Sequence, residues 1–226
     1  MKFYKYQLIN INSLSALESS KLWAAIPETF NDPFEFRLNK TNTAKGVEKL
    51  RTDNPQFSHL TDEEIVARIC DQFESEIRKM GVVCYSKDSE NILMWAHYAN
   101  DHYGMCLEFT LEDGKTFSDA AIYEVDYLED YPKIDVENIW HKDGLAKILF
   151  TKSKVWEKED ELRSIRVDGN SLVGYPENSK LTGIIFGYRT PINQIDLIKN
   201  ILKNKKISFK KMKLADSEFK LEPNSI

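Results

Sequence analysis

The chain has 226 residues, of which 42% are hydrophobic and 30% are charged, and its formal net charge is −5. This length is enough to bury a substantial core, and the acidic balance argues against nucleic-acid binding over the whole surface. No apolar run approaches the roughly 20 residues that span a bilayer, and the first residues, MKFYKYQLINI, lack the apolar core of a secretory signal. Three cysteines without a C-x-x-C pair are typical of a reducing compartment. We therefore expect a cytoplasmic protein that makes no contact with a membrane.

The first third of the chain contains a strand, a loop and one clear helix. A strand is expected at residues 3–9, where aromatic and polar side chains alternate, and a short apolar segment follows at 22–26. Residues 38–58 are polar and aperiodic, which predicts a polar insertion or mobile loop. A helix begins at Thr61 and carries apolar side chains at helical spacing until Gly81 ends it.

The rest of the chain alternates strands and helices without the regular spacing of βαβ units. Besides the short helix that Ser13 would cap between the first strand and the segment at 22–26, two more helices are expected, one beginning at Asp88 or Ser89 and one at Pro191. The remaining predicted elements are a helix at 145–156 and strands at 82–86, 105–109, 121–127, 161–167, 183–187, 207–212 and 219–221. This order predicts a single α+β domain over residues 1–226 with a mixed, mostly antiparallel sheet.

Three stretches combine reactive polar groups with large aromatic rings. The first is FNDPFEF, residues 30–36, with Trp23 just upstream. Asn31 and Asp32 are typical of a turn in which the side chain bonds its own backbone, and Pro33 stiffens that turn. The phenylalanines that bracket the turn fit either the core or the wall of a pocket.

The second stretch is NILMWAHYANDHYG, residues 91–104. A helix here would align Trp95, Tyr98 and His102 on one face. Such a stripe is usually core, but five rings within nine positions also suit a flat heteroaromatic ligand. His97 and His102 are five residues apart and do not match the i, i+4 spacing of a metal site, so we predict no metal.

The third stretch is VWEKEDELRSI, residues 155–165. If a strand begins by Glu159, then Glu159, Glu161 and Arg163 point to one face. Neighbouring carboxylates raise each other's pKa and an arginine lowers it, so the pKa values of the two glutamates would depend on this arrangement. The alternative is a solvated charge stripe at a sheet edge. The lysine-rich residues 203–213 are also more typical of a solvated edge than of a phosphate track.

Taken in order, these stretches resemble a known family. The motifs KY, LW-x-x-x-P-x-x-FNDPFE, ILMWAHYA-x-x-x-x-G and W-x-x-E-x-E-x-R are similar to those of the bacterial family called domain of unknown function 2971, from Tyr4 to about Gly187. The chain departs from this pattern at Gln7, where the family often has arginine, which weakens any role for a cation at that position. The family name implies no function.

The layout is more distantly similar to that of ADP-ribosyltransferases, which bind NAD in a cleft between two small sheets. This resemblance implies a split-sheet fold, NAD as the substrate, and a role in phage defence or as a toxin. It makes Glu161 the carboxylate that stabilises the oxocarbenium-like state, with Glu159 beside it. The implied NAD-binding residues are Tyr4 and Tyr6 for the ribose, Trp23, Phe30, Trp95 and Tyr98 for stacking, Arg163 for a phosphate, and Asn31 and Asp32 at the rim.

Two other functions fit the same residues. One is a hydrolase of nucleotides or nucleic acids, with His97, His102, Asp32 and Glu161 as acid–base groups or ligands. The other is a non-catalytic module that recognises a nucleotide or a partner protein through an aromatic pocket. Under the transferase hypothesis the acceptor is undefined, and both a nucleic acid and a protein remain open.

Overall fold

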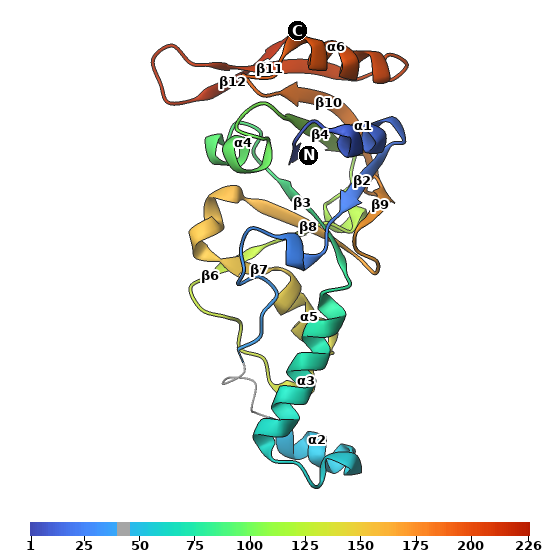
Figure 1. Cartoon of the computed structure of the whole chain (residues 1–226), viewed down its shortest axis with the longest axis vertical. Coiled ribbons are helices and arrows are strands. Elements are labelled where there is room, and N and C mark those ends of the chain that lie inside the picture. The colour runs from blue at the N-terminus through green and yellow to red at the C-terminus, as the bar shows by residue number, and fades with distance from the viewer. Residues whose placement is uncertain (40–45) are drawn as a thin grey trace.

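The computed structural model describes residues 1–39 and 46–226 and confirms the predicted α+β class with a mostly antiparallel, mixed sheet. Figure 1 shows an elongated molecule in which the C-terminal strands and α6 lie at one end and α2 and α3 lie at the other. The main sheet has the strand order β12-β11-β10-β4-β1-β3-β8-β5. Its members are β1 (Lys2–Gln7), β3 (Gly81–Ser86), β4 (Met105–Leu111), β5 (Tyr123–Glu124), β8 (Glu161–Arg166), β10 (Ser179–Phe186), β11 (Ser208–Leu214) and β12 (Leu221–Ser225).

Two smaller sheets and the helices pack around this main sheet. One small sheet is antiparallel and the other is parallel, and the β10–β11 pair of the main sheet is parallel as well. The small sheets consist of β2 (Lys21–Ala24) with β9 (Ser171–Gly174), and β6 (Asp126–Leu128) with β7 (Thr151–Ser153). The helices are α1 (Ile11–Glu18), α2 (Val47–Asp53), α3 (Asp62–Ile77), α4 (Ile92–Tyr98), α5 (Lys142–Leu149) and α6 (Ile192–Ile201).

The main sheet is nearly interrupted between β1 and β3. β1 pairs with β4 in continuous register from Lys2 to Gln7, and β3 pairs with β8 over its whole length. Between β1 and β3 the register holds only at Tyr4 and Ser86. Two well-paired halves therefore meet at a single point, and the backbones diverge on either side of it. This opening is the feature that positions the candidate site.

Helix starts follow local side-chain chemistry. Thr61 caps α3 as predicted, and its backbone N–H donates to Glu64 at 2.8 Å while the Glu64 N–H donates back to the Thr61 hydroxyl at 3.2 Å. The first helix begins earlier than expected, because Asn10 rather than Ser13 is its cap and Ser13 takes the third helical position. For α4, the cap is Asn91 rather than Asp88 or Ser89. In each case the residue whose side-chain oxygen reaches the free N–H groups decides the start.

Several predicted boundaries are wrong. Residues 47–57, inside the segment predicted to be a loop, form α2 and a short 3-10 helix, because Val47 is buried and Leu50 and Phe57 pack on the same cluster. The remainder of that prediction at residues 40–45 lies outside the described residues. The predicted helix at 145–156 is three elements: α5, β7 and a 3-10 helix at Lys154–Glu159. The strand at 121–127 is two short strands, and β9 was not predicted.

Apolar side chains form three clusters around the sheet. The largest lies on β1, β4 and β10 and includes the stacked rings of Phe3 and Phe109, whose centroids are 5.2 Å apart. A second cluster joins α3 and α5 through Phe36 to the FNDPFEF segment at residues 30–36, which we call the elbow, and a third cluster surrounds Trp95. Within the described ranges, no helix has the length and apolar character needed to cross a bilayer.

Candidate functional site

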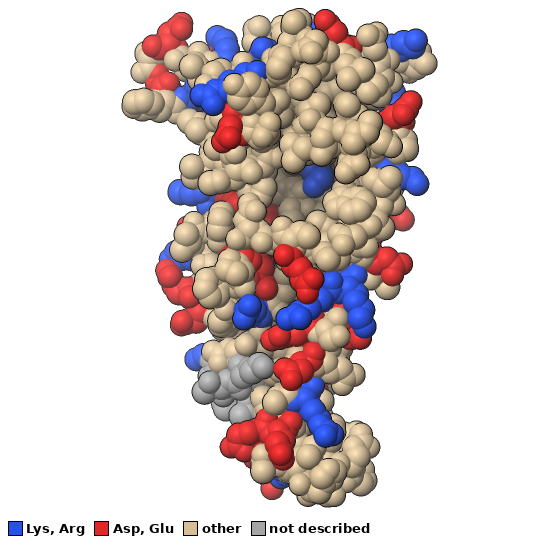
Figure 2. Space-filling view, viewed as in Figure 1, with Lys and Arg blue, Asp and Glu red and all other residues tan. Residues whose placement is uncertain are grey.

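A cavity of about 630 Å³ lies where the sheet opens between β1 and β3. Its walls come from β1, α1, β2, the elbow, β3, α4 and the segment from β7 to β8. Figure 2 shows this face of the molecule hollowed between α1 and α4, with both basic and acidic side chains in the hollow. Cavities of this size are typical of small-molecule and cofactor sites.

Aromatic side chains from four separate segments line this cavity. Tyr4 and Tyr6 come from β1, Trp23 from β2, Phe30 from the start of the elbow and Tyr98 from the last turn of α4. Trp23 is 47% exposed although it is a large ring, so its face is available to a ligand. Asn31 and His97 also line the cavity. Residues separated by nearly a hundred positions in the sequence therefore share one wall.

One end of the cavity is closed by five buried charged side chains, which we call the ion cluster: Glu35, Lys152, Glu159, Glu161 and Arg163. Lys152 bonds all three carboxylates, at 3.2 Å to Glu35, 2.6 Å to Glu159 and 3.0 Å to Glu161. Arg163 Nε donates to Glu161 Oε1 at 2.6 Å, and its Nη2 donates to both Glu161 and Glu35. Each of these side chains is less than 10% exposed.

The backbone around β8 explains why these charges converge. The strand begins at Glu161, not at Glu159, because Asp160 takes a left-handed conformation with φ of 45° and breaks the extended chain. Glu159 instead ends the 3-10 helix, where its carbonyl accepts a bond from Ser86 Oγ at 2.7 Å and its carboxylate accepts one from Tyr98 Oη at 2.7 Å. The two glutamates thus reach the same cluster by a turn rather than by the predicted period-two alternation.

The pKa values of the cluster follow from burial and from its unequal charges. Burial alone would raise the pKa of Glu161, but Arg163 and Lys152 hold it at about 2. For Glu35, burial outweighs the same two cations and raises the pKa above its usual value. Among the described residues the cluster contains three carboxylates and two cations. It therefore holds one excess negative charge or one extra proton, which is shared most readily by Glu35.

A second cationic group, Lys5, faces the cavity without a carboxylate partner. Within the part of the chain that the structure describes, its Nζ donates a single long hydrogen bond, 3.4 Å to the carbonyl of Cys84. It also lies 6.0 Å from the centre of the Tyr85 ring. Burial lowers the pKa of Lys5. An ammonium group in this position favours an anionic ligand, because the ligand would supply the missing counter-charge.

Three of the predicted site residues do not line the cavity. Trp95 is fully buried beneath Tyr6, with ring centroids 5.1 Å apart, and its indole N–H donates to the Ser89 carbonyl at 2.8 Å. Arg163 is fully buried inside the ion cluster, so it holds carboxylates instead of a phosphate. Asp32 is buried and accepts a bond from the Phe34 N–H at 2.8 Å, which fixes the elbow from within.

The histidines also separate. The helix ends at Tyr98 and carries only His97, whereas His102 lies in a turn in which three consecutive residues have positive φ. His102 packs against Tyr188, away from the cavity, whereas His97 lies at the cavity beside Trp156. The proposed hydrolase set of His97, His102, Asp32 and Glu161 therefore does not converge. In the described ranges, no group of three or more His, Cys, Asp or Glu side chains is arranged to hold a metal ion.

Three important residues were missed by the sequence reasoning. Glu35 lies within FNDPFEF itself, a segment whose aromatic residues and turn are its most evident features. Lys152 falls within the predicted helix at 145–156, which gives it no special position, and Lys5 is one of the polar residues that alternate with Tyr4 and Tyr6 in the predicted strand. Glu35 carried a usable signal, since an acid that follows a rigid turn beside aromatic residues is held in a fixed direction. Lys152 carried none.

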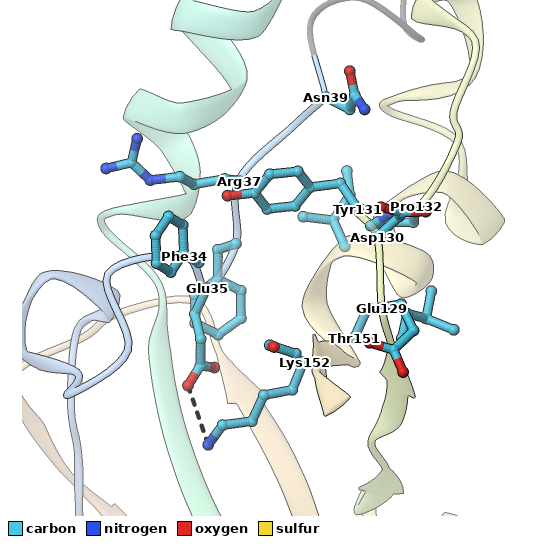
Figure 3. A pocket seen from close by; sticks show the side chains of 14 residues that line it. Phe34, Glu35, Arg37, Asn39, Glu129, Asp130, Tyr131, Pro132, Thr151 and Lys152 are labelled. Carbon is cyan, nitrogen blue, oxygen red and sulfur yellow. Dashed lines mark ion pairs between the residues drawn. The ribbon is translucent and has the colours of Figure 1, made fainter. Parts of the chain in front are cut away.

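A smaller cavity of about 290 Å³ lies on the other side of the ion cluster. It shares Glu35 and Lys152 with the larger one, and its walls also include Phe34, Tyr131 and Thr151. Figure 3 shows Glu35 and Lys152 pointing toward each other at one end of this cavity, with the rings of Phe34 and Tyr131 toward the other end. The Glu35–Lys152 pair is thus part of the wall of both cavities.

Comparison with known proteins adds one match. A family model described as "Protein of unknown function (DUF2971)" matches residues 94–164. This segment runs from α4 to β8 and contains four of the five members of the ion cluster, together with His97 and Tyr98. No curated protein and no solved structure matches the chain.

Proposed function

We propose an activity from the geometry, because the family model that matches residues 94–164 is of unknown function. The proposed activity is cleavage of the nicotinamide–ribose bond of NAD, with transfer of ADP-ribose to an acceptor. The observation that carries the proposal is the convergence of Glu159 and Glu161 with Tyr6, Trp23 and Tyr98 on one cavity of about 630 Å³. The open joint between β1 and β3 provides the cleft between two half-sheets that such a ligand requires.

The ion cluster supplies the electrostatic part of the mechanism. Cleavage of the bond between nicotinamide and ribose passes through a state in which positive charge builds on the sugar ring. An excess negative charge in a buried cluster stabilises that state more than it stabilises bound NAD, because the sugar is nearly neutral beforehand. Glu161 stays ionised throughout the physiological range, since its pKa is about 2. Glu159 is the most exposed of the three cluster carboxylates, at 9%, and would be the most accessible of them to the ligand.

Each of the other cavity residues would contact a different part of NAD. Trp23 and Phe30 offer ring faces to a base, and Tyr98, at the end of α4, donates to Glu159 of the ion cluster beside the position where the nicotinamide would bind. Lys5 would meet the diphosphate, whose charge compensates its buried ammonium group. His97 lies at the cavity and is the available acid–base side chain for the acceptor or for water. These roles link each part of NAD to a different wall.

Release of free nicotinamide from NAD tests the proposal directly. Wild-type protein is expected to release it, and Glu161→Gln and Glu159→Gln are each expected to reduce the rate at least about 100-fold, as is typical for the loss of an electrostatic catalytic group. The matched control is Glu157→Gln, an exposed carboxylate in the same 3-10 helix, whose rate should stay within about two-fold of wild type.

A second variant keeps the test decisive if the buried substitutions fail to fold. Trp23→Ala removes a half-exposed ring and is expected to fold normally while weakening NAD binding by about 10-fold, since stacking on a base contributes about 1–3 kcal/mol. If wild-type protein binds NAD but releases no nicotinamide, the chain is a binding module. If nucleotide hydrolysis is instead abolished by a chelator and restored by a divalent metal, the hydrolase hypothesis is correct.

A further inference from the structure

Two hydrogen bonds tie α4 to the 3-10 helix at Lys154–Glu159. Directly before the first residue of α4, Asn91 Nδ2 donates to the Lys158 carbonyl at 2.5 Å. At the last residue of α4, Tyr98 Oη donates to Glu159 Oε1 at 2.7 Å. The bonds at the two ends hold the two short helices side by side at the wall of the large cavity, to which Tyr98 and Glu159 both belong.

These two helices belong to different halves of the main sheet. The helix α4 packs on the half that contains β1, β4 and β10, because Trp95 lies in one apolar cluster with Tyr6 and Ile185. Glu159 ends the helix that leads into β8, and its carbonyl accepts a bond from Ser86 Oγ of β3 at 2.7 Å. The backbones of the two halves share a single register pair. The bond from the tyrosine at the end of α4 to this glutamate therefore crosses the opening between the halves.

Each carboxylate oxygen of Glu159 has its own donor. Lys152 Nζ donates to Oε2 at 2.6 Å from one half of the sheet, and Tyr98 Oη donates to Oε1 from the other. Lys152 is shared with Glu35 and Glu161, so it does not by itself set the plane of one carboxylate. Two donors on two oxygens fix both the position and the plane of the group.

We infer that Tyr98 is a positioning residue, whose hydroxyl holds the Glu159 carboxylate at the large cavity across the opening between the two halves of the sheet. The inference rests on the proposed function, in which the ion cluster stabilises the charge that builds on the ribose and Glu159 is its most accessible carboxylate. This stabilisation requires a fixed distance and direction between the carboxylate and the sugar. Burial raises the pKa of Tyr98, so its hydroxyl keeps its proton and remains a donor throughout the physiological range.

Tyr98→Phe removes the hydroxyl and keeps the ring, so it separates positioning from contact with the ligand. The variant is expected to lower the kcat of nicotinamide release by about 10- to 100-fold and to leave KM within about two-fold of wild type. Tyr103→Phe, an exposed tyrosine five residues further along, is the matched control and should leave both constants unchanged. A raised KM with an unchanged kcat would show that Tyr98 only contacts the ligand, and would overturn the inference.

A double-mutant cycle with Glu159→Leu tests whether Tyr98 acts through this carboxylate. Leucine offers no acceptor to the tyrosine hydroxyl, and its introduction leaves two carboxylates and two cations in the ion cluster, so the protein is expected to fold. In the Glu159→Leu protein, Tyr98→Phe is expected to change the remaining rate by less than about two-fold. A merely structural role would lower the rate by the same factor in both backgrounds.

The same cycle measured by thermal unfolding does not depend on activity. Tyr98→Phe is expected to lower the Tm of the wild-type protein by about 3–8 °C and not to lower the Tm of Glu159→Leu. Equal shifts in the two backgrounds would overturn the inference. If the shifts differ as expected but wild-type protein releases no nicotinamide, the proposed function is wrong and the role of Tyr98 in holding Glu159 stands. If nicotinamide is released and Tyr98→Phe leaves kcat unchanged, the inference is wrong and the proposed function stands.

Discussion

Arg163 Nε lies 2.6 Å from Glu161 Oε1 in a pair of side chains that are at most 2% exposed. Both residues are on β8, two positions apart, so the strand alone puts them on one face. Their charges are tolerated in the interior only because Lys152 and Glu35 complete the hydrogen bonding. The stability of the molecule and the chemistry of the cavity therefore depend on the same cluster.

Lys152→Met is expected to lower the free energy of unfolding by about 3–5 kcal/mol, because it leaves three buried carboxylates with a single cation. Urea unfolding followed by circular dichroism measures this change. Lys154→Met, two residues further along, removes a half-exposed lysine paired with Glu129 and should cost less than about 1 kcal/mol. Similar losses for the two variants would show that the ion cluster does not stabilise the fold.

The pH dependence of stability should show the low pKa of Glu161. Its pKa is about 2 in the folded chain and near 4.5 when unfolded, so the unfolded chain binds more protons between these values. The contribution of Glu161 to the free energy of unfolding is fully present above about pH 4.5 and is lost as the pH falls toward 2, by about 3 kcal/mol in total. Glu161→Gln should flatten the curve of unfolding free energy over this range. The control Glu157→Gln should keep the wild-type slope. If Glu161→Gln also kept the wild-type slope, the low pKa would not belong to Glu161.

Lys5→Met is expected to weaken binding of ADP by about 10- to 100-fold, because it removes the cation that would bond the diphosphate. Adenosine, which carries no phosphate, should bind wild type and variant equally. Calorimetry with both ligands measures the difference, and Lys21→Met, an exposed lysine on β2, is the control. If Lys5→Met weakened the binding of adenosine as much as the binding of ADP, Lys5 would be a structural residue of the cavity wall.

Gly187→Ala is expected to destabilise the fold by about 1–3 kcal/mol or more. A Cβ atom at this position would lie 2.0 Å from the carbonyl oxygen of His102, where the chain leaves β10 beside the turn that follows α4. Gly174→Ala, at the end of β9, places its Cβ in open space and should change stability by less than about 0.5 kcal/mol. Thermal unfolding compares the two, and an equal effect would mean that the turn relaxes to accept the methyl group.

The local parts of the fold could be predicted because they depend on neighbouring residues. The capping box of α3 needs only Thr61 and Glu64, and the alternation in β1 and β8 needs only the order of residues within each strand. The rings of Trp23, Phe30 and Tyr98 line one cavity, and their assignment to NAD stays a prediction. The prediction that Trp95 lines the same cavity is wrong, because spacing along a helix does not say which face of the helix the sheet covers.

The sequence by itself determined the α+β class, most of the strands and the kinds of side chain available to the site, because propensity, capping and periodicity act within a few residues. Only the tertiary structure decided that β1 and β3 part after one residue pair, that Glu35 joins Glu161 across 126 positions, and that Lys152 lies between them. These are long-range contacts. A buried charge is tolerated only when its partners are in place, and these partners meet only when distant segments have folded against each other.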